Sequence, residues 1–163
     1  MIYALILILG ILSFNRTEEW QTEMSLWSSA VNRGYEMARS HLYLGLAHKD
    51  QGDLAAADSS FARAATDRSM AARAINNRGS IAYLREDYSE ARRRYLEALE
   101  IWPDYPDALS GLATVRYQEA RQRRDLSMMD EVIAGYRYVL TIDPHHQATI
   151  DNLNLALEAV GHK

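Results

Sequence analysis

The feature that most constrains this chain is a residue pattern that recurs every 34 positions. Leu44-Gly45 is followed at that spacing by Arg78-Gly79 and then by Leu112-Ala113. Other residues recur at the same step, namely Phe61 with Tyr95 and Ala64 with Ala98. A period of this size indicates an array of stacked units, because one unit alone cannot bury its apolar face. Such a chain is expected to work by presenting a binding surface and not by catalysing a reaction.

The composition supports an all-α fold. Hydrophobic residues make up 48% of the 163 residues, much of this share is alanine, and there are only 8 Gly and 3 Pro. Alanine is the best helix former. The net charge of −4 argues against a nucleic-acid partner, which would require a basic surface. The absence of cysteine excludes disulfides, cysteine-based zinc sites and thiol chemistry.

Residues 1–14 form an apolar run without a charge. As a helix the run would span roughly 21 Å, less than the ~30 Å of a hydrocarbon core. Three interpretations compete: a signal-peptide core, a buried helix of the array, and a membrane anchor that continues a longer span. We favour the anchor, because Arg16 and Trp20 suit a position at the membrane interface.

The orientation of this anchor follows from the charges beyond it. The next 25 residues carry no excess of positive charge, with Arg16, Arg33 and Arg39 against Glu18, Glu19, Glu23 and Glu36. Cytoplasmic flanks are usually enriched in Lys and Arg. The sequence therefore predicts a membrane-anchored protein whose soluble part is extracytoplasmic.

Helical periodicity continues to the C-terminus. Residues 15–37 are expected to be a partial repeat whose helix carries an apolar stripe of Trp20, Met24, Trp27 and Val31. Residues 38–163 are expected to form the array. Its predicted helices are 38–50 with 54–66, 72–85 with 88–101, a third pair from Pro106 to Ile142, and a last helix over 147–160.

The third pair is longer than the others. Pro103 and Pro144 lie 41 positions apart, seven more than the repeat. Seven residues are close to two helical turns, so an insert of this length keeps the helix faces aligned. We expect both helices of the pair to gain a turn and residues 118–129 to form a protruding tip.

These residues resemble the tetratricopeptide repeat (TPR) family. Small residues are expected where two helices cross and large ones in the adjoining hole, as in Gly45, Gly79, Ala57 and Ala91 with Phe61, Tyr95 and Tyr136. The resemblance implies an α-solenoid of helix pairs that ends in a capping helix, with the N-terminal apolar helix before it. The sequence departs from the family pattern at five positions: His41, His48, Ser69, Arg78 and Arg116.

A second resemblance covers about 40 N-terminal residues. The apolar run, Asn15–Trp20 and Met24–Trp27, followed by repeats, is similar to the tail of multi-span membrane glycosyltransferases that carry TPRs. The catalytic membrane part of such a protein would be absent from this chain.

No motif of an active site, a cofactor site or a metal site is present. His41 and His48 lie on one helix face and are interpreted as packing residues. His145 and His146, with Asp143, are interpreted as exposed loop residues. The run Arg92-Arg93-Arg94 is interpreted as a solvated face whose arginines pair with Glu90 and Glu97.

The candidate binding surface is a stripe beside the core positions of each first helix. The resemblance implies that it lines a concave groove. Its members are Arg39, Leu42, Leu46, Lys49, Arg73, Asn76, Asn77, Ser80, Tyr83, Asp107, Ser110, Thr114 and Tyr117. The carboxylate clamp of chaperone-binding TPRs is not matched, because Leu42, Leu46, Asp107 and Gly111 occupy its places.

The sequence thus predicts a non-catalytic TPR scaffold, tethered to a membrane through residues 1–14, that binds a protein or peptide segment in this groove. The alternative is an accessory domain of a membrane glycosyltransferase whose catalytic part lies elsewhere. The partner and the oligomeric state are left open by the sequence.

Overall fold

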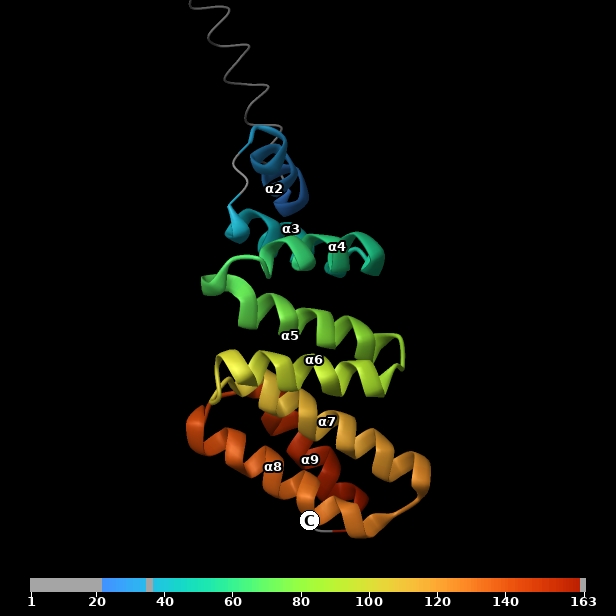
Figure 1. Cartoon of the computed structure of the whole chain (residues 1–163). Helices are drawn as coiled ribbons and strands as arrows, with labels where there is room; N and C mark the ends of the chain where they lie inside the picture. Colours follow the sequence, from blue (N-terminus) through green and yellow to red (C-terminus); the bar gives the residue numbers. More distant parts are fainter. Residues whose placement is uncertain (1–21, 35–36, 162–163) are drawn as a thin grey trace, which may run out of the picture. The chain divides into compact units, whose positions relative to one another are not determined.

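A computed structural model describes residues 22–34 and 37–161 of the chain (Figure 1), and within them regular structure is helical throughout. The chain divides into two compact units, Met1–Met70 and Ala71–Lys163. The predicted anchor, residues 1–14, lies outside the described residues. Among the described helices, none combines the length and the apolar character that crossing a membrane requires.

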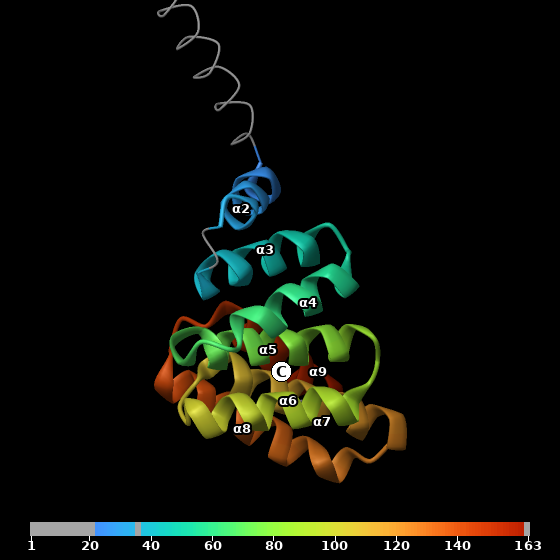
Figure 2. The ribbon, with the colours of Figure 1, turned by 45° about the horizontal axis from the view of Figure 1, so that its top comes forward.

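The first unit contains α2 (Glu23–Asn32), α3 (Ala38–Asp50) and α4 (Leu54–Ala64), drawn in blue to green in Figure 2. α3 and α4 form a helix pair. A Cβ atom at Gly45 would lie 2.6 Å from the ring of Phe61, which is fully buried. The pair therefore requires glycine at this crossing, as the repeat pattern predicts.

α2 packs on α3 through a stacked aromatic pair. The ring centroids of Trp27 and Tyr43 lie 4.6 Å apart at an interplanar angle of 14°. Met24, Trp27 and Val31 of the predicted stripe are half-buried, and α2 contains no fully buried residue. The described part of the 15–37 segment is thus a helix that packs on α3, and its aromatic contact is of a type worth about 0.5–1.5 kcal/mol.

The second unit contains most of α5 (Arg68–Leu84), then α6 (Tyr88–Ile101), α7 (Pro106–Arg123), the short 3-10 helix η1 (Leu126–Met128), α8 (Met129–Ile142) and α9 (Gln147–Ala159). The ring of Tyr95 on α6 lies against two glycines. A Cβ at Gly79 of α5 would meet this ring at 2.8 Å, and one at Gly111 of α7 at 2.5 Å. Helices on both sides thus approach α6 through a glycine.

The core of the α7–α9 region is built around Tyr136 of α8, which is 1% exposed. Val132 and Ile133 of the same helix join it, together with Ala113 of α7 and Ala156 of α9. α9 packs on both α7 and α8 and turns a mostly polar face to solvent. It therefore has the character of the capping helix that the sequence predicts.

The turns between paired helices repeat their capping chemistry at the 34-residue step. Asp53 accepts a hydrogen bond from the backbone N–H of Ala56 at 3.0 Å, and Asp87 accepts one from Glu90 at 3.0 Å. Side-chain oxygens at this position satisfy an N–H group that has no partner within the helix.

Two expectations about helix length are wrong. The seven-residue insert lengthens α7 and the turn after it, whereas α8 and α6 both have 14 residues. A left-handed residue, Arg124 at φ 52°, ends α7, and η1 leads into α8. α5 begins at Arg68 rather than at residue 72, because Asp67 accepts hydrogen bonds from the backbone and hydroxyl of Ser69 and so supports an earlier first turn.

Candidate protein-binding surface

The first-unit members of the predicted stripe lie on α3. Arg39 is exposed, and Leu46 and Lys49 are half-buried. Leu42 is only 5% exposed and belongs to the core. Lys49 also interacts with other residues of the chain. On α3 the stripe therefore presents a guanidinium group at its start, while Leu42 contributes to packing.

On α5 the stripe begins with Arg73, which is exposed. Asn76 is 8% exposed, and its side-chain oxygen Oδ1 is buried without a hydrogen-bond partner among the described residues. Asn77 donates from its side-chain amide to the carbonyl of Arg73 at 2.9 Å. The side-chain amide of Asn77, a member of the predicted stripe, is thus engaged with its own helix.

Further along α5, Ser80 and Tyr83 are half-buried. The hydroxyl of Tyr83 accepts a hydrogen bond from the side-chain amide of Gln118 on α7 at 2.9 Å. Its ring lies 5.6 Å from that of Tyr88. Tyr83 is therefore held by α7 and by α6, so that its position on the surface is fixed before any ligand binds.

On α7 the stripe is connected to α9 by a chain of hydrogen bonds. Asp107 lies 2.9 Å from Nε2 of His146, and Nδ1 of His146 lies 2.7 Å from the hydroxyl of Thr149. That hydroxyl donates to Oγ of Ser110 at 2.9 Å. His146 also caps α9 by accepting from the backbone N–H of Thr149. Because Nδ1 accepts from this backbone N–H group, the neutral ring has its own N–H at Nε2, where it can donate a hydrogen bond to Asp107.

The remaining α7 positions are fixed in the same way. Oγ1 of Thr114 accepts from the hydroxyl of Tyr136 at 3.1 Å and from the amide of Asn152 at 3.3 Å. The ring of Tyr117 packs against the core cluster around Tyr136, and the guanidinium of Arg121 lies 5.8 Å from its centroid. α9 thus uses part of the polar stripe of α7 for its own docking.

The stripe is consequently not exposed at every position. Leu42, Asn76 and Ser110 stand at one repeat position, 34 residues apart, and all are buried. Ser110 is buried because Thr149 of α9 covers it and forms a hydrogen bond with it. Ala108 is the α7 residue that corresponds to Thr149 at the 41-residue step. An alanine at that place has no hydroxyl to offer, and Oδ1 of Asn76 is without a hydrogen-bond partner among the described residues.

The stripe also continues onto α9, beyond the residues that were predicted for it. The 41-residue step from α7 to α9 identifies four exposed residues, Ala148, Asp151, Leu155 and Glu158. Leu155 is 53% exposed. The spacing between Pro103 and Pro144 was the signal that could have found them. In the second unit the stripe therefore runs from one cation, Arg73, toward several carboxylates.

Buried tyrosines next to this surface stay neutral over the physiological range. Burial raises the pKa of Tyr136 to about 12, although the hydrogen bond to Thr114 works in the opposite direction. Burial also raises the pKa of Tyr95 and of Tyr105. These phenols serve as packing groups and hydrogen-bond donors, and their environment gives none of them an ionised form near neutral pH.

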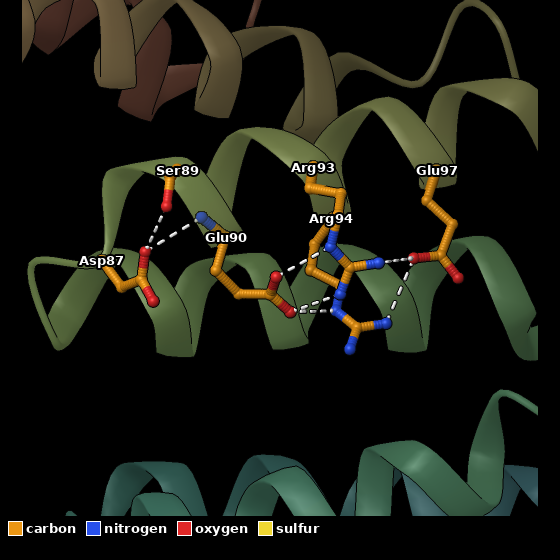
Figure 3. A network of polar contacts seen from close by, with 6 residues as sticks. All are labelled: Asp87, Ser89, Glu90, Arg93, Arg94 and Glu97. Carbon is orange, nitrogen blue, oxygen red and sulfur yellow. Dashed lines mark hydrogen bonds and ion pairs between the residues drawn. The ribbon is translucent and has the colours of Figure 1, made fainter.

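The arginine run on α6 is neutralised by carboxylates (Figure 3). Arg93 and Arg94 both bond to Glu90, at 2.6 Å and 2.8 Å, and both lie close to Glu97. Arg92 pairs with Glu119 of α7. The interpretation of this run as a solvated, paired face is confirmed by these contacts.

The histidines also follow their predicted roles in part. His41 is buried and interacts with other residues, as expected of a packing residue. His145 is exposed, whereas His146 is half-buried and caps α9, so its prediction as an exposed loop residue is wrong. The described residues contain no cluster of three side chains able to hold a metal ion.

Comparison with known proteins agrees with this geometry. Residues 79–119, which include α6 and most of α7, match the family model described as TPR repeat. This segment of the chain is thus similar to a TPR repeat. No curated protein sequence matches it.

Several solved structures share the TPR fold of this protein. A crystal structure of MamA superposes with a TM-score of 0.62 at 20% identity, over 85% of this chain and 77% of that one. The first TPR of Spaghetti (RPAP3), bound to the HSP90 peptide SRMEEVD, gives 0.61 at 18% identity over 76% and 93%. The Arabidopsis OM64 TPR domain gives 0.63 at 16% identity over 76% and 97%. Likeness at these identities establishes the fold.

Proposed function

We propose that this protein is a non-catalytic interaction module that binds an extended protein segment on the stripe of its second unit. The observation that carries the proposal is the row of half-buried and exposed polar and aromatic side chains on α5 and α7. Tyr83 is held in place by Gln118 at one end of that row, and Arg73 is exposed at the other.

The fold supports this role. TPRs are in general protein-interaction scaffolds, and two solved TPR structures with the same fold hold peptides, the RPAP3 domains with SRMEEVD and with SGPTIEEVD. Those peptides are acidic. The second-unit stripe of this protein has Asp107, Asp151 and Glu158 toward its C-terminal end, so a segment bound there is expected to be neutral or basic beyond the contact with Arg73.

The test is a selection from a phage-displayed library of random peptides on the full chain, followed by anisotropy titrations of the enriched peptides. The variant Arg73→Ala/Ser80→Arg removes the cation from position 73 and places a long charged side chain in the middle of the stripe, and it should weaken binding by about tenfold or more. The matched control is Arg93→Ala on α6, which should leave affinity unchanged. Equal binding by the stripe variant, or a selection without enriched peptides, would refute the proposal.

We further propose that residues 1–14 tether the protein to a membrane, with the TPR part on the extracytoplasmic side. The support is the uncharged apolar run followed by Arg16 and Trp20. Fractionation of cells that express the full chain or a version starting at Asn15 tests this. Equal solubility of both without detergent would remove the tether from the proposal. The alternative, an accessory domain of a membrane glycosyltransferase, stays a prediction.

A further inference from the structure

The first unit contains a cleft of about 880 Å³ at one end of its helix pair. Its walls are the start of α3, the last turn of α4, the residues between α4 and α5, and the first turn of α5. The volume lies in the range of about 300–1,000 Å³ that is usual for ligand sites. The cleft is separate from the second-unit stripe, so an occupant would go beyond the function proposed above.

Two guanidinium groups face this cleft. Arg39 comes from the first turn of α3 and Arg63 from the last turn of α4, and both side chains are exposed. Within residues 22–34 and 37–161, neither forms an ion pair with a carboxylate, in contrast to Arg92, Arg93 and Arg94. Two cations brought together by different helices, without a carboxylate from the described chain, repel one another and favour an anionic ligand.

Among the described residues that line the cleft, Asp67 is the one carboxylate, and it is already engaged. It accepts hydrogen bonds from the backbone N–H of Ser69 at 2.8 Å and from its hydroxyl. These bonds lower the pKa of Asp67, so it carries its charge at neutral pH. Two arginines against one aspartate leave the described lining of the cleft with a net positive charge, which attracts an anionic group.

The apolar part of the lining comes from two methionines. Met37 is 62% exposed and stands at the N-terminus of α3, and Met70 is half-buried in the first turn of α5. Methionine is unbranched and polarisable and adapts to varied apolar partners. A free inorganic anion would not use such walls, whereas a peptide can offer a carboxylate and an apolar side chain together.

We propose that this cleft binds an acidic peptide segment, in which Arg39 and Arg63 pair with its carboxylates and Met37 and Met70 contact the apolar side chains between them. Arg39 thereby acts in a cleft that α4 also lines, not only as the first member of a groove along α3. Paired arginines suit carboxylates because each guanidinium can present two parallel N–H groups.

The test uses the full chain and a dye-labelled peptide of alternating Glu and Leu, with the corresponding Gln and Leu peptide as its matched control. The protein should bind the Glu peptide about tenfold more tightly than the Gln peptide, and Arg39→Gln/Arg63→Gln should remove that preference. Arg85→Gln/Arg137→Gln, which removes two exposed arginines of the second unit, should retain it. Amide shifts on titration should concentrate in residues 37–41 and 63–70.

Three results would overturn the proposal. The first is equal binding of the two peptides. The second is an equal loss of binding in the two double variants, which would mean that overall charge alone attracts the peptide. The third is displacement of the Glu peptide by inorganic phosphate at the same concentration, which would make the cleft a general anion site. Unchanged binding of the Glu peptide by Arg73→Ala/Ser80→Arg separates this cleft from the second-unit stripe.

Discussion

Replacing Gly111 with alanine tests the helix crossing that organises the second unit. The Cβ atom of an alanine there would lie 2.5, 2.7 and 2.8 Å from three ring carbons of Tyr95. Favourable carbon–carbon separations are about 3.5–4.0 Å, so the ring would have to move by about 1 Å. The same ring also lies close to Gly79 of α5, where an added Cβ would be 2.8 Å away, so the ring has little free space around it.

The expected free-energy change is the difference between two terms. Overpacking of a close-packed core costs about 1–3 kcal/mol. Gly→Ala inside a helix recovers up to about 1 kcal/mol of helix propensity. We therefore expect Gly111→Ala to lower the free energy of unfolding by about 1–2 kcal/mol and the melting temperature by several degrees.

Urea denaturation followed by circular dichroism measures this change. Gly135→Ala on α8 is the matched control, because its Cβ would meet only the Cβ of Ala113, at 3.3 Å, and it should cost less. Tyr95→Leu in the Gly111→Ala background should cost less than the sum of the two single changes, by at least about 0.5 kcal/mol. A Gly111→Ala protein as stable as the parent, or strict additivity with Tyr95→Leu, would show that the crossing is assigned wrongly.

Three further predictions concern buried polar groups. Asn76→Leu should raise the free energy of unfolding by about 1 kcal/mol in urea titrations. The reason is that Oδ1 of Asn76 is buried without a partner among the described residues, and that a leucine, Leu42, already occupies the equivalent position of the preceding repeat. A loss of stability would show that this oxygen has a hydrogen-bond partner. Thr149→Val should destabilise the folded protein by about 1–3 kcal/mol, because it leaves the hydroxyl of Ser110 unpaired, and adding Ser110→Ala should restore most of that loss. A double variant that is as unstable as Thr149→Val alone would contradict this. Because the pKa of Tyr136 is raised to about 12 in the fold, against about 10 when unfolded, the folded state holds its proton more tightly. This contribution to stability is fully present below pH 10 and is lost as pH rises toward 12, so urea midpoints should fall over that window and fall less in Tyr136→Phe.

The candidate surface was only partly predictable. Position in the repeat identifies which residues follow the stripe, and Arg39 and Arg73 are exposed as expected. Burial of Ser110 was not predictable, because it depends on Thr149, a residue 39 positions away that reaches it only when α9 docks on α7. Nor could periodicity indicate that Arg39 and Arg63 line one cleft, since that depends on how α3 and α4 cross.

The sequence by itself determined the helices and the places where they cross. The 34-residue recurrence of small and large residues required helix pairs with glycine facing an aromatic ring, because local periodicity and side-chain volume decide that packing. Only the tertiary structure decided how the seven-residue insert is divided, because α7 and the turn could absorb it while the packed core around Tyr136 held α8 at the length of α6. It also decided which polar groups are used internally. The chain from Asp107 through His146 to Thr149 forms only when two helix ends meet, and the energy of a hydrogen bond depends on a partner that the linear sequence does not specify.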